Sequence, residues 1–442
     1  MTTAAQRPVD IASIAAFRII FGAVMVAGLV RLLVSGQIPQ VYGEPTFFFT
    51  YPGFHWVQPW PVWGMYVHYG ALAILAIMIM LGAWTRVAAA LFTLGFAYTQ
   101  LVDITNYLNH HYLVVLLGGL LAVVPANAAW SLDVRRRPQL RRDHVPAWIV
   151  WLVRFQVGVV YVFAGLAKAK SDWLLHGQPL NIWLAARTET PIIGALFDEP
   201  SVALAMSWAG FLFDTTIVLW LSWARTRVPA YIALIAFHGL TGYLFNIGMF
   251  PLIMTSAALI FFSPAWPRRF VKASAPGAPS DPLSLPSRRA RIAITTWVIV
   301  QIALPLRHVV YPGNVLWNED GMRFAWHVMI REKHGAVTFI AEVDGQRVEV
   351  PPSTYLTWRQ EREMAGQPDL ILQLARKIGA DMHARGIHHV RVFAETEVSL
   401  NGRAPAPLID PNVDLLSIRD LGTRDWVLPA PLTEPPVIQP LR

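Results

Sequence analysis

The sequence has no cysteine and few charged residues. Its 442 residues are 14% charged and 55% hydrophobic, whereas soluble domains are usually ~25% charged. The lack of cysteine excludes a disulfide framework, a thiolate metal site and a cysteine nucleophile. The low charge content excludes a disordered chain or an ordinary soluble protein, because water does not cover so much apolar surface. The formal net charge of +8 is therefore first a membrane-topology signal, and we expect no nucleic-acid partner.

Long apolar runs recur along the first two thirds of the chain. A membrane-spanning helix needs roughly 20 apolar residues, so we expect a polytopic α-helical membrane protein with eight or nine spans. The segments fall near residues 11–34, 62–82, 87–105, 111–126, 146–168, 202–222, 229–246, 247–263 and 290–306. Gly248 and Pro251 interrupt the seventh and eighth segments, so this pair of spans is the least clearly predicted. The first is too long for the apolar part of a signal peptide and is interpreted as a retained anchor.

Basic residues lie between alternate pairs of these segments. Arg135, Arg136, Arg137, Arg141 and Arg142 form the densest basic cluster. The loops 35–61 and 103–110 contain neither Lys nor Arg. By the positive-inside rule, this alternation predicts a cytoplasmic N-terminus. Nine spans then place the C-terminus on the extracytoplasmic side, which is the periplasm if the chain lies in a bacterial inner membrane.

The composition changes at residue 307. We expect a transmembrane helical domain over 1–306, which includes a cytoplasmic linker rich in Pro and Ser over 263–289. The remaining residues, 307–442, hold about half of all charges and predict an extracytoplasmic β-rich α+β domain. Three elements are expected in it: a hairpin with Asp344-Gly345 as its turn, an amphipathic helix near 369–386, and an alternating run that ends at Asn401-Gly402.

Ionisable side chains within the spans are candidates for function, because placing them in lipid is unfavourable. Lys168 lies near the outer end of the fifth span, where a desolvated, uncharged amine is a competent general base. The predicted topology places His110 and, somewhat deeper, His238 in the same half of the bilayer. Three proton-handling groups at similar depth favour an acid–base site. The alternative is that Lys168 and Lys170 anchor a helix end at the interface, with Asp172 as the i,i+4 partner of Lys168.

The other ionisable residues have structural alternatives as well. His110 and His111 together are consistent with an interfacial pair bound to headgroups or loop carbonyls. His238 is consistent with a hydrogen bond between helices. Asp214 and Arg154, which lie within the sixth and fifth spans, could form a structural ion pair with each other. No GxGxxG motif, P-loop or HExxH motif occurs, and we predict no metal site.

Several segments together resemble one known family. They are NYLNHHYLVVLL, QVGVVYVFAGLAKAKSDWL, FHGLTGYLFNIGMFP, FFSPAWPRR, GMRFAWHVMI and LIDPNVDLL. In this order they resemble the vitamin K-dependent gamma-carboxylase family and the wider bacterial group that shares its horizontally transferred transmembrane (HTTM) domain. The resemblance covers nearly the whole chain, and AGLAK followed by DW is its most specific element.

The resemblance implies a site and a reaction. In that family a Lys shortly after an Ala-Gly pair deprotonates vitamin K hydroquinone, and this residue matches Lys168. A His in an Asn-His segment before Tyr-Leu assists, and it matches His110. We expect the quinone site to include His238, Tyr161, Trp173 and Asn109. Oxygen adds to the quinol anion, the resulting alkoxide removes a γ-proton from glutamate, carbon dioxide adds, and the quinone leaves as its epoxide. The implied cofactors are vitamin K hydroquinone or menaquinol, oxygen and carbon dioxide, and the implied partners are the lipid bilayer, an isoprenoid quinone and a glutamate-containing peptide.

The sequence departs from the animal carboxylases at two positions of the GMRFAWHVMIREK segment. His327 stands where those proteins have an acidic residue, and Arg331 stands where they have a His. The expected function is that of a gamma-glutamyl carboxylase-like enzyme, a carbon–carbon lyase and epoxidase. Two alternatives stay open: a quinol epoxidase that does not carboxylate, and a non-enzymatic membrane transporter or scaffold.

Overall fold

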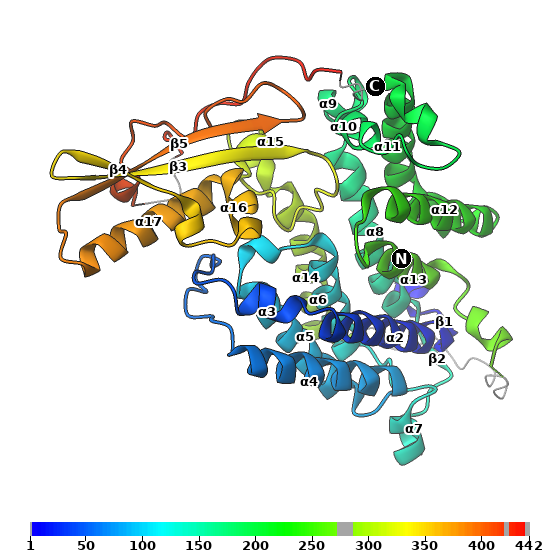
Figure 1. Cartoon of the computed structure of the whole chain (residues 1–442). Coiled ribbons are helices and arrows are strands. Elements are labelled where there is room, and N and C mark those ends of the chain that lie inside the picture. The colour runs from blue at the N-terminus through cyan, green and yellow to red at the C-terminus, as the bar shows by residue number, and fades with distance from the viewer. Residues whose placement is uncertain (1, 272–285, 420–423, 438–442) are drawn as a thin grey trace.

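The computed structural model describes residues 2–271, 286–419 and 424–437. Most of the chain is helical, and the long helices are gathered in one body with a small β-sheet and two helices beside it (Figure 1). The cytoplasmic linker expected over 263–289 lies for the most part outside the described residues.

A helix occurs at each position where the sequence predicts a span. The helices are α2 (Ala12–Val34), α4 (Val62–Leu81), α5 (Thr85–Leu101), α6 (Asn109–Val123), α8 (Ala147–Ala167), α11 (Pro200–Ser222), α12 (Arg227–Phe245), α13 (Phe250–Ala257) and α14 (Arg288–Leu306). Within the described residues, six helices are long and apolar enough to cross a membrane: α2, α4, α8, α11, α12 and α14 with its short extension to Val310. A membrane-spanning helical body is confirmed, whereas the expected count of eight or nine spans stays a prediction.

Helices α8 and α11 pack closely, and this contact places the candidate catalytic amine. A Cβ atom added to Gly165 would lie 2.8 Å from the backbone nitrogen of Thr215, so only glycine allows this approach. Small residues at helix contacts are typical of membrane bundles. Because α8 ends at Ala167, Lys168 caps its C-terminus and lies against α11.

Short elements connect the long helices. They are α1 (Thr2–Gln6), α3 (Gln37–Tyr42), α7 (Leu132–Arg136), α9 (Ser171–Leu174), α10 (Leu180–Ala185) and α15 (Val315–Asn318), with strands β1 (Pro8–Asp10) and β2 (His144–Pro146). Strands β1 and β2 pair antiparallel, with Pro8 opposite Pro146. Arg268 adds an ion pair to the same end of the bundle, with its Nε 2.5 Å from Oδ2 of Asp10.

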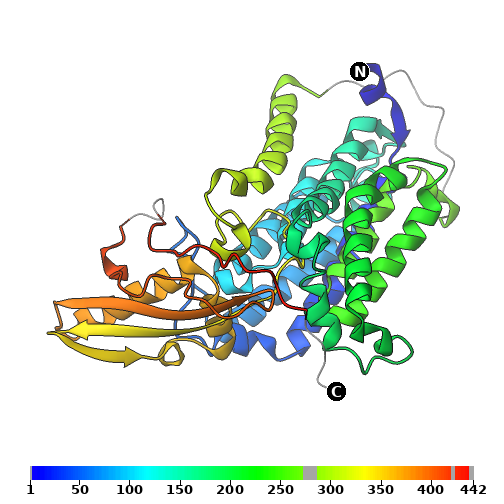
Figure 2. The same cartoon turned by 90° about the horizontal axis from the view of Figure 1, so that it is seen from above.

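The C-terminal part contains a three-stranded antiparallel sheet. Its strands are β3 (Lys333–Val343), β4 (Gln346–Val350) and β5 (Val390–Leu400), in the order β4-β3-β5, with α16 (Trp358–Ala365) and α17 (Pro368–Ala384) packed beside them. Figure 2 shows β3, β4 and β5 extending away from the helical body. The expected hairpin is confirmed, because Asp344 and Gly345 form its turn with φ angles of 50° and 79°. The expected amphipathic helix is α17, whose buried face packs against β5.

Candidate active site

An apolar cavity of about 550 Å³ lies where the helical body meets the C-terminal part. Residues of α2, α3, α5, α6 and α13 line it together with Val328 and Met329; among them are Met25, Leu29, Ile38, Phe96, His110 and Phe250. Its volume is within the usual range for sites that bind small organic ligands. The imidazole of His110 lines this cavity and, within the described part of the chain, has no hydrogen-bond partner. Its ring nitrogens are therefore available to a ligand.

Lys168 lies beside this cavity and is almost completely buried. Its Nζ donates hydrogen bonds to Oδ2 of Asp214 at 2.9 Å and to the carbonyl oxygens of Ala164 at 3.2 Å and Val328 at 3.3 Å. The Nζ also lies 5.2 Å from the centre of the Trp173 ring. The pairing with Asp172 that the alternative expected is not formed, because Asp172 accepts hydrogen bonds from Arg403 instead. Lys168 does cap the end of α8, as that alternative expected, but its side chain is buried and only 5% of the residue is exposed.

The buried pair of Lys168 and Asp214 differs from the isolated, uncharged amine that we expected. Oδ2 of Asp214 lies 2.9 Å from Nζ of Lys168, so the amine has a carboxylate partner. The side chains of the pair are only 6% and 8% exposed. Lys168 is therefore paired with a second ionisable group, which approaches from α11.

The amine does not itself line the cavity. Val328 does, and its carbonyl oxygen accepts a hydrogen bond from Lys168. Of the six residues predicted for the site, His110 and Asn109 line the cavity, whereas Lys168, Trp173, His238 and Tyr161 do not. The Asn109 side chain donates to the carbonyl oxygen of His327 at 3.2 Å, and Trp173 Nε1 donates to the Ser207 carbonyl oxygen at 2.7 Å.

His238 and Tyr161 form a hydrogen-bonded pair between α12 and α8. Tyr161 Oη and His238 Nε2 are 2.9 Å apart, which matches the alternative of a hydrogen bond between helices. The pair is nevertheless close to the cavity, because the Phe250 ring lies 5.8 Å from the ring of His238 and 6.0 Å from that of His110. Within the described residues, Nδ1 of His238 is buried without a hydrogen-bond partner.

The ion pair considered between Asp214 and Arg154 is not formed. The Arg154 guanidinium instead donates to the carbonyl oxygens of Ile260, Phe261 and Phe262. These carbonyls lie at the end of a short 3₁₀ helix, where they lack partners within the helix. Arg154 therefore has a structural role, and Asp214 is free to pair with Lys168.

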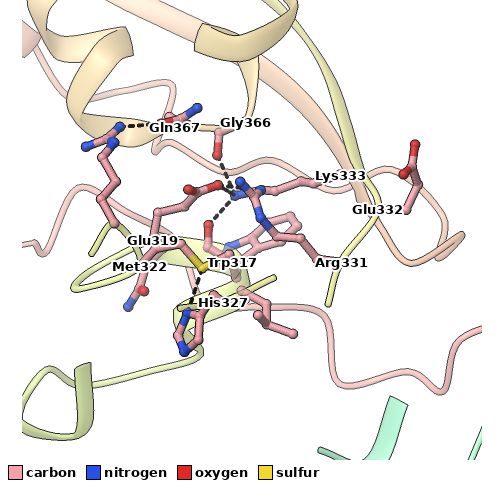
Figure 3. Close-up of polar contacts among 12 residues, drawn as sticks. Trp317, Glu319, Met322, His327, Arg331, Glu332, Lys333, Gly366 and Gln367 are labelled. Carbon is pink, nitrogen blue, oxygen red and sulfur yellow. Dashed lines mark hydrogen bonds and ion pairs between the residues drawn. The ribbon is translucent and has the colours of Figure 1, made fainter. Parts of the chain in front are cut away.

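A second, polar cavity of about 220 Å³ adjoins the first, and the two share Asn109 and Met329 in their walls. Its lining includes Glu319, Arg323, His327, Arg331, Glu363 and Gln367. Figure 3 shows the polar contacts around it. Glu319 pairs with Arg331, whose Nη1 is 2.5 Å from the carboxylate. Lys333, from the start of β3, points into the same cluster and donates to the carbonyl oxygens of Trp317 and Gly366.

Burial shifts the protonation of this polar cluster. It lowers the pKa of Lys333 to about 7, although the nearby Glu319 carboxylate acts in the opposite direction. Burial also lowers the pKa of His327 to about 3, with His308 and other positive groups adding to the effect. The pKa of Arg323 is raised because Asp369 outweighs the effect of burial. At neutral pH His327 is therefore neutral, whereas Lys333 can gain or lose its proton. In the described part of the chain, no group of three or more metal-ligating residues occurs.

These features define a membrane-embedded helical protein with a buried acid–base pair at its junction with a smaller α+β part. The sequence profile of the HTTM domain matches residues 6–266, which is more than half of the chain. The profile of the vitamin K-dependent gamma-carboxylase lumenal domain matches residues 287–433. The chain therefore belongs to the vitamin K-dependent gamma-carboxylase family. Both matches together point to a membrane protein of the gamma-glutamyl carboxylase-like type. No match was found among solved structures.

Proposed function

We propose that this protein oxidises vitamin K hydroquinone, or the related menaquinol, to its epoxide with oxygen, coupled to carboxylation of glutamate in a peptide. The observation that carries the proposal is the arrangement around Val328. On one side of this residue the apolar cavity presents His110, and on the other side the buried amine of Lys168 binds the Val328 carbonyl oxygen. A site of this kind has room for an apolar ring, and two groups that can exchange protons, His110 and Lys168, lie beside that space.

The residues of the cavity fit a quinol. Apolar side chains from α2, α5 and α13 would hold the ring and the first part of its isoprenoid tail, which reaches the cavity from the lipid. His110 would bind one ring hydroxyl, because its imidazole lacks another partner in the described part of the chain. Because the amine lies behind Val328 and does not itself line the cavity, Lys168 would take the proton from that hydroxyl once the Val328 carbonyl oxygen gives way to it, and Asp214 would stabilise the ammonium that forms. When bound, the deprotonated quinol supplies, with oxygen, a base strong enough to remove a γ-proton of glutamate.

Exclusion of water supports the same proposal. A strong base formed in this site would be quenched by water, so the site has to be dry. Lys168 and Asp214 are buried, and Trp173 lies against the amine. Tyr161 and His238 would support the Phe250 side of the cavity from behind.

The polar cavity is the space that we propose for the glutamate side chain. It shares Asn109 and Met329 with the apolar cavity, so a carboxylate held there would place its γ-carbon toward the quinol. Arg331 would bind this carboxylate, since guanidinium groups bind carboxylates in a bidentate manner. Because His327 and Arg331 differ from the residues of the animal carboxylases, an epoxidase that does not carboxylate is the second candidate.

We further propose the membrane arrangement that the basic residues predict. The helical domain over 1–306 would lie in the inner membrane with a cytoplasmic N-terminus and linker, and residues 307–442 would form the extracytoplasmic domain. The basic cluster around α7 supports this orientation. The amine of Lys168 lies at the opposite end of α8 from this cluster.

Epoxide formation tests the proposal. Purified protein in lipid nanodiscs is given vitamin K hydroquinone or menaquinol with oxygen, and epoxide is measured by chromatography. Lys168→Ala should lower the rate by roughly 10²–10⁴-fold, the usual contribution of a general base. Lys170→Ala is the matched control, because Lys170 is exposed two positions away and should retain the wild-type rate. An unchanged rate in Lys168→Ala would refute the assigned base.

Labelled carbon dioxide separates the two enzymatic candidates. Incorporation into a glutamate-containing peptide, dependent on quinol and lost in Lys168→Ala, supports carboxylation. Epoxide without incorporation, over a range of peptides, supports the epoxidase. If neither product forms with any quinol, the transporter or scaffold alternative is favoured.

A further inference from the structure

A cluster of polar residues fastens the C-terminal part of the chain to the loop that follows Lys168. Asp172, four positions after Lys168, accepts hydrogen bonds from Arg403 Nη1 at 2.6 Å and Nη2 at 2.7 Å and from Asn401 Nδ2 at 2.7 Å. The carboxylate therefore receives a bidentate guanidinium and an amide in a site where the Arg403 and Asp172 side chains are only 10% and 12% exposed. Burial alone would raise the pKa of Asp172, but the bonds from Arg403 and Asn401 leave it below its usual range. Asp172 is thus charged throughout the neutral range.

The same cluster continues to the segment that contacts the catalytic amine. Asn401 donates its backbone N–H to the carbonyl oxygen of Glu332 at 2.7 Å, and its side-chain oxygen accepts the Glu332 N–H at 2.8 Å. Glu332 also accepts a bond from Trp183 Nε1 at 2.6 Å. One end of the segment 322–332 is therefore fixed by groups from both parts of the chain.

The other end of this segment is held by the start of α6. Tyr107 Oη accepts the backbone N–H of Phe324 at 2.8 Å, and Tyr112 stacks on Trp326 with ring centres 5.0 Å apart. Val328, whose carbonyl oxygen binds Lys168, lies between these two attachments. The position of that carbonyl oxygen is therefore set by contacts on both sides.

The backbone of the segment needs such support. Phe324, Trp326 and Met329 have φ angles of 62°, 59° and 52°, values that residues with side chains rarely adopt. Left-handed conformations at bulky residues persist only where the surrounding contacts determine them. Three of them within six residues indicate that the segment would relax if one of its attachments were removed.

We propose that Asp172, Arg403 and Asn401 are positioning residues for the amine of Lys168. They hold the Glu332 end of the segment, which keeps the Val328 carbonyl oxygen on Lys168 and closes the amine against water. This role rests on the proposed function of Lys168 as the base, but the geometry can be tested independently of activity. None of the three residues touches the apolar cavity.

Chemical labelling of Lys168 provides the test. Protein in nanodiscs is treated with an acylating reagent, and the labelling rates of Lys168 and of exposed Lys170 are compared by mass spectrometry. Arg403→Ala and Asn401→Gly should each raise the ratio of Lys168 to Lys170 labelling at least tenfold. Gly accepts the φ of 52° at position 401, so the second variant removes the side chain without straining the backbone. Arg391→Ala is the matched control, because Arg391 lies on β5, the strand that leads into Asn401 and Arg403, but pairs with Glu342 away from the segment.

Kinetics add a readout that a general loss of stability would not give. With epoxide formation as the assay, kcat should fall at least tenfold in Arg403→Ala and Asn401→Gly. KM for the quinol should change far less, because most of the cavity wall comes from α2, α3, α5, α6 and α13, and only Val328 and Met329 belong to the segment. Arg403→Lys keeps the charge but loses the bidentate geometry and should fall between wild type and Arg403→Ala. An unchanged labelling ratio in both Arg403→Ala and Asn401→Gly would overturn the proposal. Should the wild type form no epoxide, the proposed function fails, and the labelling ratios still decide the positioning role.

Discussion

The ion pair between Lys168 and Asp214 should contribute measurably to stability. We consider Lys168→Met, Asp214→Leu and the double variant. At an N–O distance of 2.9 Å and an effective dielectric constant of ~20, the Coulomb energy of the pair is about 6 kcal/mol. Loss of solvation on burial offsets much of it. Each single variant leaves a buried polar group without its partner, which destabilises proteins by about 3–5 kcal/mol.

The double variant distinguishes this reasoning from a simple loss of packing. Replacing both partners of a buried pair by apolar residues is often neutral or stabilising, so the two effects should not add. With single losses of about 3–5 kcal/mol each and a nearly neutral double variant, the double-mutant cycle should give a coupling energy of about 6–10 kcal/mol. The free energy of unfolding is measured from denaturation curves of the four proteins in mixed micelles. Single variants that each lose less than about 1 kcal/mol, with losses that add in the double variant, would refute the pair as an energetic unit.

Three further predictions concern the packing, the polar cluster and the cavity. Gly165→Ala should separate α8 from α11, lower the free energy of unfolding by about 1–3 kcal/mol and reduce epoxide formation, whereas Gly158→Ala, whose Cβ would meet only a Val side chain at 3.3 Å, should change both far less. Because the pKa of Lys333 is about 7 in the folded protein and 10.5 in the reference state, the unfolded chain binds more protons between these values, and stability should rise with pH across this range by at most about 1.4 kcal/mol per pH unit. Comparison of unfolding curves for wild type and Lys333→Met isolates this contribution, and equal slopes would contradict it. His110→Ala should lower kcat for epoxide formation by roughly 10–100-fold, the usual value of one hydrogen bond to a charged group, and a wild-type rate would exclude His110 from the site.

The elements with a clear periodic pattern could be predicted from the sequence. Apolar runs marked every long helix, and alternation with Asp344-Gly345 marked the hairpin of β3 and β4. These signals are local, because each depends on residues within one element. Lys168 was singled out for the same reason, since an amine within an apolar run is unusual in any arrangement of the helices.

The partner of Lys168 could not be predicted from position along the spans. Asp214 lies 14 residues after Pro200, the first residue of α11, or about 21 Å along the helix axis. If α8 and α11 ended at the same level, Asp214 would lie far from Lys168 and nearer to Arg154. The structure instead places the end of α8 beside the middle of α11, because α9, α10 and a 3₁₀ helix at Gly194–Asp198 connect the two helices. The offset between two helices depends on such connections and not on hydropathy.

Contacts between the two parts of the chain had no sequence signal at all. Arg403 and Asp172 are separated by more than 200 positions, and although Asp172 belongs to the DW pair of the family resemblance, that pair does not indicate its partner. The positive φ angles in segment 322–332 could not be predicted either, because Phe and Trp, the residue types at positions 324 and 326, rarely adopt a positive φ. Such features follow from the tertiary structure alone.

The small sheet of β1 and β2 limits how the helical body can move. It joins the start of α2 to the start of α8 by backbone hydrogen bonds, and Arg268 fastens the chain after α13 to the same place. Lys168 lies at the other end of α8, some 20 residues away. The sheet therefore keeps the starts of α2 and α8 together, and the Lys168 end of α8 is held separately, by the contacts of Asp172 with Arg403 and Asn401.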